Sequence, residues 1–274
     1  MKKIIIRIMF FVALISILCP IEGEVVNAKG INKIENLNNK NPNSIKFLED
    51  KNGIVIIKTI TENVVIVDGK DSNKIELVNK IKEENGMNLY MLVIRNTDLE
   101  TEFFIRRMIN SMNIKKIVVP NINNLNKNLV EYLKIKKISL RDMKMGFNSN
   151  VGNVELRGKC ISGLNNEGMI FCSVDNIKVG FISREMLKEI KKEKFVLNNK
   201  VDVLNIRGSS DFTKSEFREI VKELRPIKII GNDENEIYYL KEAKKRGVKY
   251  YSLKNRGCLI IKRILGETKE FEII

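Results

Sequence analysis

Short apolar runs alternate with stretches of amphipathic helical spacing along most of the chain from position 45 onward. Each run has the length of a buried strand and is bounded by polar or glycine-containing segments, which is typical of strands that lie inside a sheet. We predict strands over residues 45–48, 54–58, 64–67, 89–94, 117–120, 201–206, 227–230, 249–253 and 258–262.

Helices are predicted between these strands, beginning near Asp71, Thr97, Thr213 and Asp233. Thr97 and Thr213 are each followed by a glutamate three positions later, which is the spacing of a capping box. The last helix should end at Gly247, because glycine is favoured just beyond a helix C-terminus. The helix from Thr213 has one apolar face, made of Phe217, Ile220, Val221 and Leu224.

Residues 154–182 are predicted to form antiparallel strands, with turns at 163–168 and 175–176. The strands then fall into two groups, each accompanied by helices. This order favours an α/β (α+β) fold, a four-layer αββα sandwich in which two sheets pack face to face and helices cover both outer faces. No shift in composition divides the segment, so we predict one domain over residues 45–274.

The first 28 residues have the layout of a signal peptide: Lys2, Lys3 and Arg7 precede an apolar run over residues 8–18. The small side chains of Val26-Asn27-Ala28 favour cleavage before Lys29, and an uncleaved membrane anchor is the alternative. Residues 29–44 form an Asn-rich linker. We therefore expect a protein that is secreted, or held at the outer face of the membrane by its N-terminal segment alone.

Basic residues outnumber acidic ones, with 49 Lys and Arg against 34 Asp and Glu, which gives a formal net charge of +15. This balance favours an anionic partner, and we expect a polyanion, either DNA or a cell-wall polymer. The sequence contains no histidine. Mechanisms that need an imidazole base, a Ser-His-Asp triad or a histidine-ligated zinc are therefore excluded.

Three cysteines follow the export segment, Cys160, Cys172 and Cys258. A Cys160–Cys172 disulfide is compatible with an exported protein and with neighbouring strands. Burial of all three as free thiols is the alternative, since cysteine also packs as a small apolar residue.

Three segments in order carry a resemblance to a known family. A strand ends in Val67-Asp68-Gly69, the next is followed by Asn96-Thr97-Asp98-Leu99-Glu100-Thr101, and a later one by Arg207-Gly208-Ser209-Ser210. The chain resembles the metallo-β-lactamase fold superfamily, and within it the C-terminal domain of ComEC-type competence (DNA-uptake) proteins. In the family the second segment is His-x-Asp-x-Asp-His, and the third contains His-His-Gly-Ser.

The resemblance implies two zinc or manganese ions, held by histidines and carboxylates, that activate a hydroxide. Here every histidine position is occupied by another residue, so we expect a vestigial site with no catalytic residue, no metal and no cofactor. The positions of this site are Asp68, Asn96, Asp98, Glu100, Thr101, Glu185, Gly208 and Ser209. Arg95, Arg184 and Arg207 stand beside them and are candidate anion-binding residues, in a closed salt-bridge cluster or an open phosphate site.

We therefore expect an exported, catalytically inactive relative of the ComEC-type domains that serves as a DNA- or polyanion-binding or scaffold module. The alternative is an active hydrolase that cleaves DNA phosphodiesters with non-histidine metal ligands. Basic stretches over residues 188–194 and 241–249 are candidate phosphate contacts. Tyr250 and Tyr251 either stack on exposed bases or pack in the core.

Overall fold

The computed structural model describes residues 43–48, 53–68, 74–97, 101–161, 164–183, 186, 200–206, 212–231, 236–254, 257–263 and 271–273. All of them belong to one compact unit, Asn41–Ile274. The predicted export segment and most of the predicted linker lie outside the described residues. Within the described ranges, no helix is long and apolar enough to cross a membrane.

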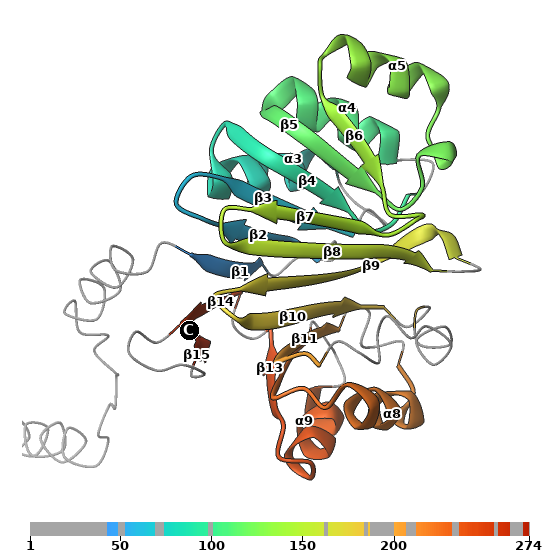
Figure 1. Cartoon of the computed structure of the whole chain (residues 1–274). Helices are drawn as coiled ribbons and strands as arrows, with labels where there is room; N and C mark the ends of the chain where they lie inside the picture. Colours follow the sequence, from blue (N-terminus) through green and yellow to red (C-terminus); the bar gives the residue numbers. More distant parts are fainter. Residues whose placement is uncertain are drawn as a thin grey trace, which may run out of the picture. The chain divides into compact units, whose positions relative to one another are not determined.

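The described strands form two sheets (Figure 1). The first has the strand order β15-β14-β1-β2-β3-β4-β5-β6. Its strands are β1 (Ser44–Leu48), β2 (Val55–Lys58), β3 (Asn63–Val67), β4 (Asn88–Ile94), β5 (Asn113–Val119), β6 (Ser139–Asp142), β14 (Cys258–Arg263) and β15 (Phe271–Ile273). The pairs from β3 to β6 are parallel, so the carboxyl ends of these strands meet at one edge.

The second sheet has the order β13-β12-β11-β10-β9-β8-β7. Its strands are β7 (Phe147–Val151), β8 (Val154–Ile161), β9 (Leu164–Val174), β10 (Ile177–Ile182), β11 (Val203–Ile206), β12 (Lys228–Gly231) and β13 (Lys249–Ser252). The pairs from β10 to β13 are parallel, whereas β7, β8 and β9 form an antiparallel meander.

The described helices cover the two outer faces (Figure 1). The helices are α3 (Lys74–Asn85), α4 (Thr101–Ser111), α5 (Lys127–Ile135), α8 (Lys214–Leu224) and α9 (Glu236–Lys244), with a 3₁₀ turn at Ile122–Asn124. One apolar cluster joins the facing sides of the two sheets, through residues such as Phe47 and Phe181. Separate clusters join α3, α4 and α5 to the first sheet and α8 and α9 to the second. The predicted four-layer αββα sandwich is therefore confirmed.

Local signals in the sequence account for several boundaries. The side chain of Thr213 accepts a hydrogen bond from the Glu216 backbone N–H, and the Thr213 backbone N–H donates to the Glu216 carboxylate. The predicted capping box therefore starts α8. Gly247 follows α9 with a φ of 70°, a left-handed conformation that favours glycine. Asp175 and Asn176 form the predicted turn between β9 and β10, with φ values of 51° and 69°.

The predicted turn over residues 163–168 is wrong, because β9 begins at Leu164 and continues to Val174. Gly168 pairs with Cys160 inside the ladder. A Cβ at Gly168 would lie 2.5 Å from the sulfur of Met143, so this glycine permits close packing rather than a turn. The prediction also omitted α5, β6, β7 and β15, which are short or carry little apolar periodicity.

The three cysteines of the described residues, Cys160, Cys172 and Cys258, are free thiols, and Cys160 and Cys172 form no disulfide. In the ladder between β8 and β9, Cys172 faces Leu156, whereas Cys160 faces Gly168. The two cysteines are thus offset along the strands, and both are buried in the core between the sheets. Burial raises the pKa of the Cys172 thiol well above its ordinary value.

Candidate functional site

Four residues of the predicted site are described, Asp68, Arg95, Asn96 and Thr101, and they lie near the carboxyl ends of the parallel strands β3 and β4. Asp68 follows β3, Arg95 and Asn96 follow β4, and Ser183 follows β10. The carboxyl ends of strands are the usual place for ligands in open α/β sheets, because the loops there point into one crevice. Asp98, Glu100, Arg184, Glu185, Arg207, Gly208 and Ser209 lie outside the described residues.

Arg95 and Asp68 form a buried ion pair at this point. Arg95 Nη1 lies 3.6 Å from Asp68 Oδ2, and the two side chains are 2% and 1% exposed. The guanidinium carbon lies 5.8 Å from the centre of the Phe181 ring, in cation–π contact with a residue of the second sheet. Arg95 therefore faces the interior and Asp68, whereas the other two candidate anion-binding residues, Arg184 and Arg207, lie outside the described residues.

Strand β9 holds the loop that carries Arg95. The Gly168 N–H donates to the Arg95 carbonyl at 2.7 Å, and the Thr97 N–H donates to the Asn166 carbonyl at 2.9 Å. Asn96 and Glu167 form an isolated antiparallel bridge. These bonds join the end of β4 in the first sheet to β9 in the second, so the backbone around Arg95 is fixed from both sides.

Thr101, the first residue of α4, also belongs to this cluster. Its Oγ1 donates to the Asn96 carbonyl at 3.5 Å, and both residues are buried. The Asn96 side-chain oxygen is buried and accepts no hydrogen bond within the part of the chain described. The structure therefore brings Asp68, Arg95, Asn96 and Thr101 together, as their positions after neighbouring strands predict.

Glu167 and Ser183 lie in the same cluster and were missed by sequence reasoning. The Ser183 hydroxyl donates to Glu167 Oε1 at 2.6 Å, and Glu167 is 3% exposed. Glu167 was missed because residues 163–168 were assigned to a turn. The signal that could have identified it is its place two positions before the apolar run 169–172, from which it is separated only by Gly168.

The described residues of this cluster do not fit the dinuclear metal centre that the resemblance implies. A fixed guanidinium cation occupies one side of Asp68 and repels any second cation there. Asn96 and Thr101 offer neutral oxygen atoms where the family has imidazoles. Within the described ranges, no group of three or more His, Cys, Asp or Glu side chains is placed to hold a metal ion.

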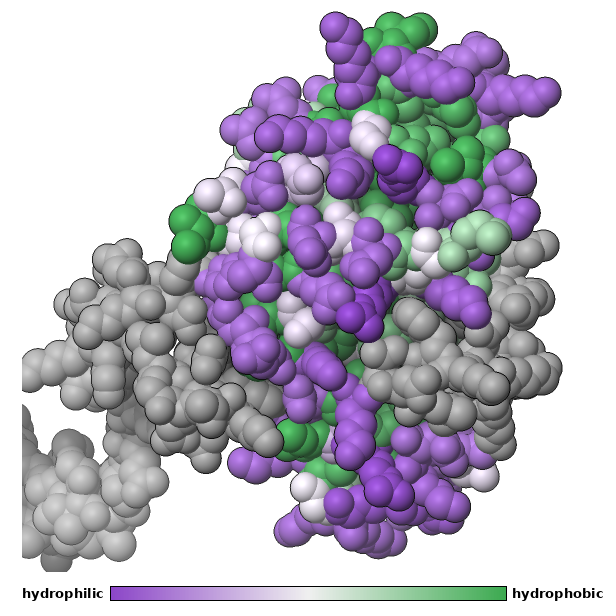
Figure 2. All heavy atoms as spheres, viewed as in Figure 1, coloured by the Kyte–Doolittle hydropathy of each residue, from purple (hydrophilic) through white to green (hydrophobic). Residues whose placement is uncertain are grey.

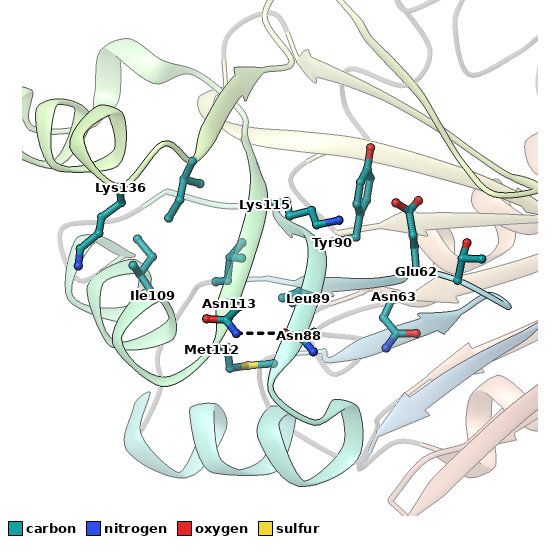
Figure 3. Close-up of a pocket in the computed structure, with 13 residues that line it drawn as sticks. Glu62, Asn63, Asn88, Leu89, Tyr90, Ile109, Met112, Asn113, Lys115 and Lys136 are labelled. Carbon is teal, nitrogen blue, oxygen red and sulfur yellow. Dashed lines mark hydrogen bonds between the residues drawn. The ribbon is translucent and has the colours of Figure 1, made fainter.

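A pocket of about 540 Å³ opens at the opposite ends of β4 and β5 (Figure 3). Asn113 Nδ2 donates to Asn88 Oδ1 at 3.1 Å on its floor. The ammonium groups of Lys115 and Lys116 lie 5.7 Å and 5.3 Å from the centre of the Tyr90 ring. Sequence reasoning assigned no role to these residues, since no motif distinguishes them from a solvated strand end.

A second pocket of about 510 Å³ lies beside α9 and β13, and we call it the α9–β13 pocket. Its walls are Leu240, Lys241, Lys244, Gly247, Val248, Lys249, Tyr250 and Tyr251. None of these residues is acidic. The basic stretch that the sequence places at 241–249 therefore contributes directly to a concave surface, whereas residues 188–194 lie outside the described ranges.

The sequence matches no protein-family model and no curated protein. Solved structures are similar in fold. The chain matches CmlA, a diiron β-hydroxylase from Streptomyces venezuelae, with a TM-score of 0.52 and 10% identity, over 81% of this chain and 54% of CmlA. It matches the metallo-β-lactamase fold protein YhfI from Bacillus subtilis with a TM-score of 0.52 and 9% identity, over 80% of this chain and 99% of YhfI.

These similarities show the fold alone, which is the metallo-β-lactamase fold of YhfI. The chain spans about half the length of CmlA, with 54% covered. The expectation of no cofactor, drawn from the missing histidines, is contradicted, because CmlA has the same fold and is a diiron protein. Absence of histidine therefore excludes histidine ligands but does not exclude a metal from a protein of this fold.

Proposed function

We propose that this chain, which has the metallo-β-lactamase fold, is a polyanion-binding module that uses the fold as a scaffold rather than as a catalyst. The observation that carries the proposal is the α9–β13 pocket, where Lys241, Lys244 and Lys249 line one concave surface and none of the described lining residues is acidic. Such a surface attracts phosphate-rich polymers in a salt-dependent and sequence-independent manner.

The charge of the whole chain supports the same partner. A net charge of +15 creates a field that raises the local concentration of anionic polymers and their rate of association. Figure 2 shows hydrophilic side chains over most of the visible face, including the region of α8 and α9. DNA is the first candidate and a cell-wall polymer the second, since both present rows of phosphates.

A scaffold role is supported by the buried Arg95–Asp68 ion pair at the strand ends. Substrate binding at that edge needs an open, polar surface, whereas Arg95 and Asp68 are 2% and 1% exposed and face each other. A permanently charged guanidinium does not donate or accept a proton near neutral pH. We propose the outer cell surface as the place of action, because of the predicted export segment over residues 1–28.

The competing function is a metal-dependent phosphodiesterase. It is favoured by the fold shared with CmlA, a diiron enzyme, and by the acidic residues Asp98, Glu100 and Glu185 at positions where the family has ligands. Carboxylates are suitable ligands for hard divalent cations such as Mn²⁺.

The two functions are separated by measuring binding and cleavage on the same full chain. Single-stranded DNA, duplex DNA and inorganic polyphosphate are titrated at about 50 mM and 200 mM salt, where several phosphate contacts cost at least tenfold in affinity. The same DNAs are incubated with Zn²⁺ or Mn²⁺, and the Asp98→Ala/Glu100→Ala variant is the control. Salt-sensitive binding without cleavage supports the module. Cleavage that the variant abolishes supports the enzyme, and absence of binding to all three refutes the module.

A further inference from the structure

Three exposed apolar residues lie in successive connections along one edge of the first sheet. Ile60 lies in the turn between β2 and β3, Met87 in the loop before β4, and Ile135 at the end of α5, before β6. They are 76%, 51% and 77% exposed, and we call them the apolar tips. Single exposed apolar residues are ordinary on a soluble protein, whereas several gathered at one edge indicate a contact surface.

The apolar tips share the edge at which the parallel strands β3, β4, β5 and β6 begin (Figure 1). The residues that directly follow them, Thr61, Asn88 and Lys136, line one pocket (Figure 3). Since adjacent strands lie about 4.8 Å apart, the three steps from β3 to β6 spread the tips over roughly 15 Å. A partner that contacts all three must therefore be a broad surface rather than a small molecule.

Lysines accompany the apolar tips. Ile135 is flanked in the sequence by Lys134, Lys136 and Lys137, all exposed, and the exposed Lys115 lines the same pocket as Lys136. Among the described residues that line this pocket, a single glutamate stands against the two lysines. Exposed apolar side chains beside cations match a bilayer with anionic headgroups, because the apolar groups enter between acyl chains while the lysines stay at the headgroups.

The chain also enters the described fold at this edge. Ser44, at the start of β1, pairs with Lys58 at the end of β2, directly before the turn that carries Ile60. The Asn43 side chain donates a hydrogen bond of 3.1 Å to the turn between β9 and β10, which fixes the point of entry. A linker as long as the predicted one, residues 29–44, spans at most about 50 Å. An export segment that stays in the membrane therefore gives this edge a high effective concentration of bilayer.

We propose that this edge is a docking surface for a membrane that carries anionic lipids. The apolar tips insert at the level of the acyl chains, and the lysines beside Ile135, together with Lys115, contact the lipid phosphates. The inference goes beyond the proposed polyanion binding and does not depend on it, because a polymer of phosphates has no apolar interior to receive the tips. It also extends membrane contact beyond the N-terminal segment, to which sequence reasoning restricted it.

Tryptophan substitution reports on this contact at single positions, because the chain contains no tryptophan. The reporters are Ile60→Trp and Ile135→Trp. The control is Met145→Trp, since Met145 is 92% exposed and follows the end of β6 at the opposite edge. Each full-length variant is mixed with vesicles of phosphatidylcholine alone, or of phosphatidylcholine with phosphatidylglycerol, whose acyl chains carry bromine as a quencher. Circular dichroism checks that each variant is folded.

With vesicles that contain phosphatidylglycerol, the emission of both reporters should shift to shorter wavelength. Bromine should quench the two reporters about threefold or more relative to Met145→Trp, because only the tips reach the acyl chains.

Two variants with equal loss of charge test the lysines in the Ile60→Trp chain. Lys136→Gln/Lys137→Gln should lower the quenching about threefold or more, because each lysine near an anionic surface contributes to binding. Lys144→Gln/Lys254→Gln should leave it unchanged, since these exposed lysines follow the ends of β6 and β13 at the opposite edge.

The outcomes separate this inference from polyanion binding. Quenching of both reporters no stronger than that of Met145→Trp overturns the docking surface, and the polyanion function stands on its DNA and polyphosphate titrations. Equal quenching by vesicles without phosphatidylglycerol overturns the role of the lysines. Inorganic polyphosphate without vesicles should leave the emission of Ile60→Trp unchanged, and the same shift with polyphosphate alone would overturn the bilayer as the partner.

Discussion

Replacing Arg95 tests whether the cluster at the strand ends is held by a buried ion pair. Arg95→Met keeps an unbranched side chain of similar length and removes the charge, which leaves Asp68 buried beside an apolar group. At an N–O separation of 3.6 Å and an effective dielectric constant of about 20, the Coulomb attraction that is lost is about 5 kcal/mol. Breaking one partner of a buried pair costs about 3–5 kcal/mol, so we expect a loss of that size in the free energy of unfolding.

The double variant Arg95→Met/Asp68→Leu should recover most of this loss, because an apolar pair carries no desolvation penalty. Arg157→Met is the matched control. Arg157 pairs with Glu155 at 2.7 Å, but the two side chains are 46% and 37% exposed, and water screens the pair. We expect its loss to stay below about 1 kcal/mol.

The assay is urea unfolding followed by far-ultraviolet circular dichroism at pH 7, with the slope against urea checked for each variant. A loss for Arg95→Met no larger than that for Arg157→Met would refute the assignment of a strong buried pair. A double variant less stable than Arg95→Met would show instead that Asp68 has a further role in the fold.

Three other predictions concern separate parts of the molecule. Hydrogen bonds from Arg218, and then from Lys245, lower the pKa of Glu242 to about 2, so its stabilisation is complete above about pH 4.5 and is lost as the pH falls towards 2. Glu242→Gln should therefore lose less stability than the wild type between pH 5 and pH 2.5 in urea titrations, and equal losses would contradict this. Burial raises the pKa of both Cys172 and Cys258, but only Cys258 is partly accessible. With Ellman's reagent on the native chain, Cys258→Ser should remove one reacting thiol and Cys172→Ser none. Gly168→Ala should destabilise the fold by about 1–3 kcal/mol through its contact with Met143, measured as a lower thermal midpoint, whereas an unchanged midpoint would mean that Met143 moves aside.

The parallel strands were the part of the fold that the sequence predicted most directly. β3 and β4 contain continuous apolar runs, and β11 has a single polar residue, Asn205, because both faces of these strands are covered. Such runs can be recognised in the sequence without knowledge of the partner strands. β7 carries Asn148 and Asn150 at alternating exposed positions and has one buried end, so its pairing with β8 rather than its own composition defines it. β9 was misplaced for the same reason, since its first residues pair with β8 across an irregular register.

The same distinction separates the site residues that were predicted from those that were missed. Asp68, Arg95 and Asn96 follow runs that are strands by themselves, and the rule that parallel strands end at one edge brings them together. Glu167 reaches the cluster from an antiparallel hairpin of the other sheet. Its position depends on how the two sheets face each other, which no local periodicity encodes.

In the α9–β13 pocket, the position of a basic stretch beside the edge of a sheet determines whether its lysines line a concave surface. Lys241 and Lys244 are spaced one helical turn apart and on their own indicate only a solvated helix face. Lys249 joins them because the turn at Gly247 returns the chain directly into β13. The pocket forms because β13 has a neighbouring strand, β12, on one side only within the described sheet. A strand added at that edge would fill the pocket, so strand order, and not the number of lysines, determines whether these charges can reach a ligand.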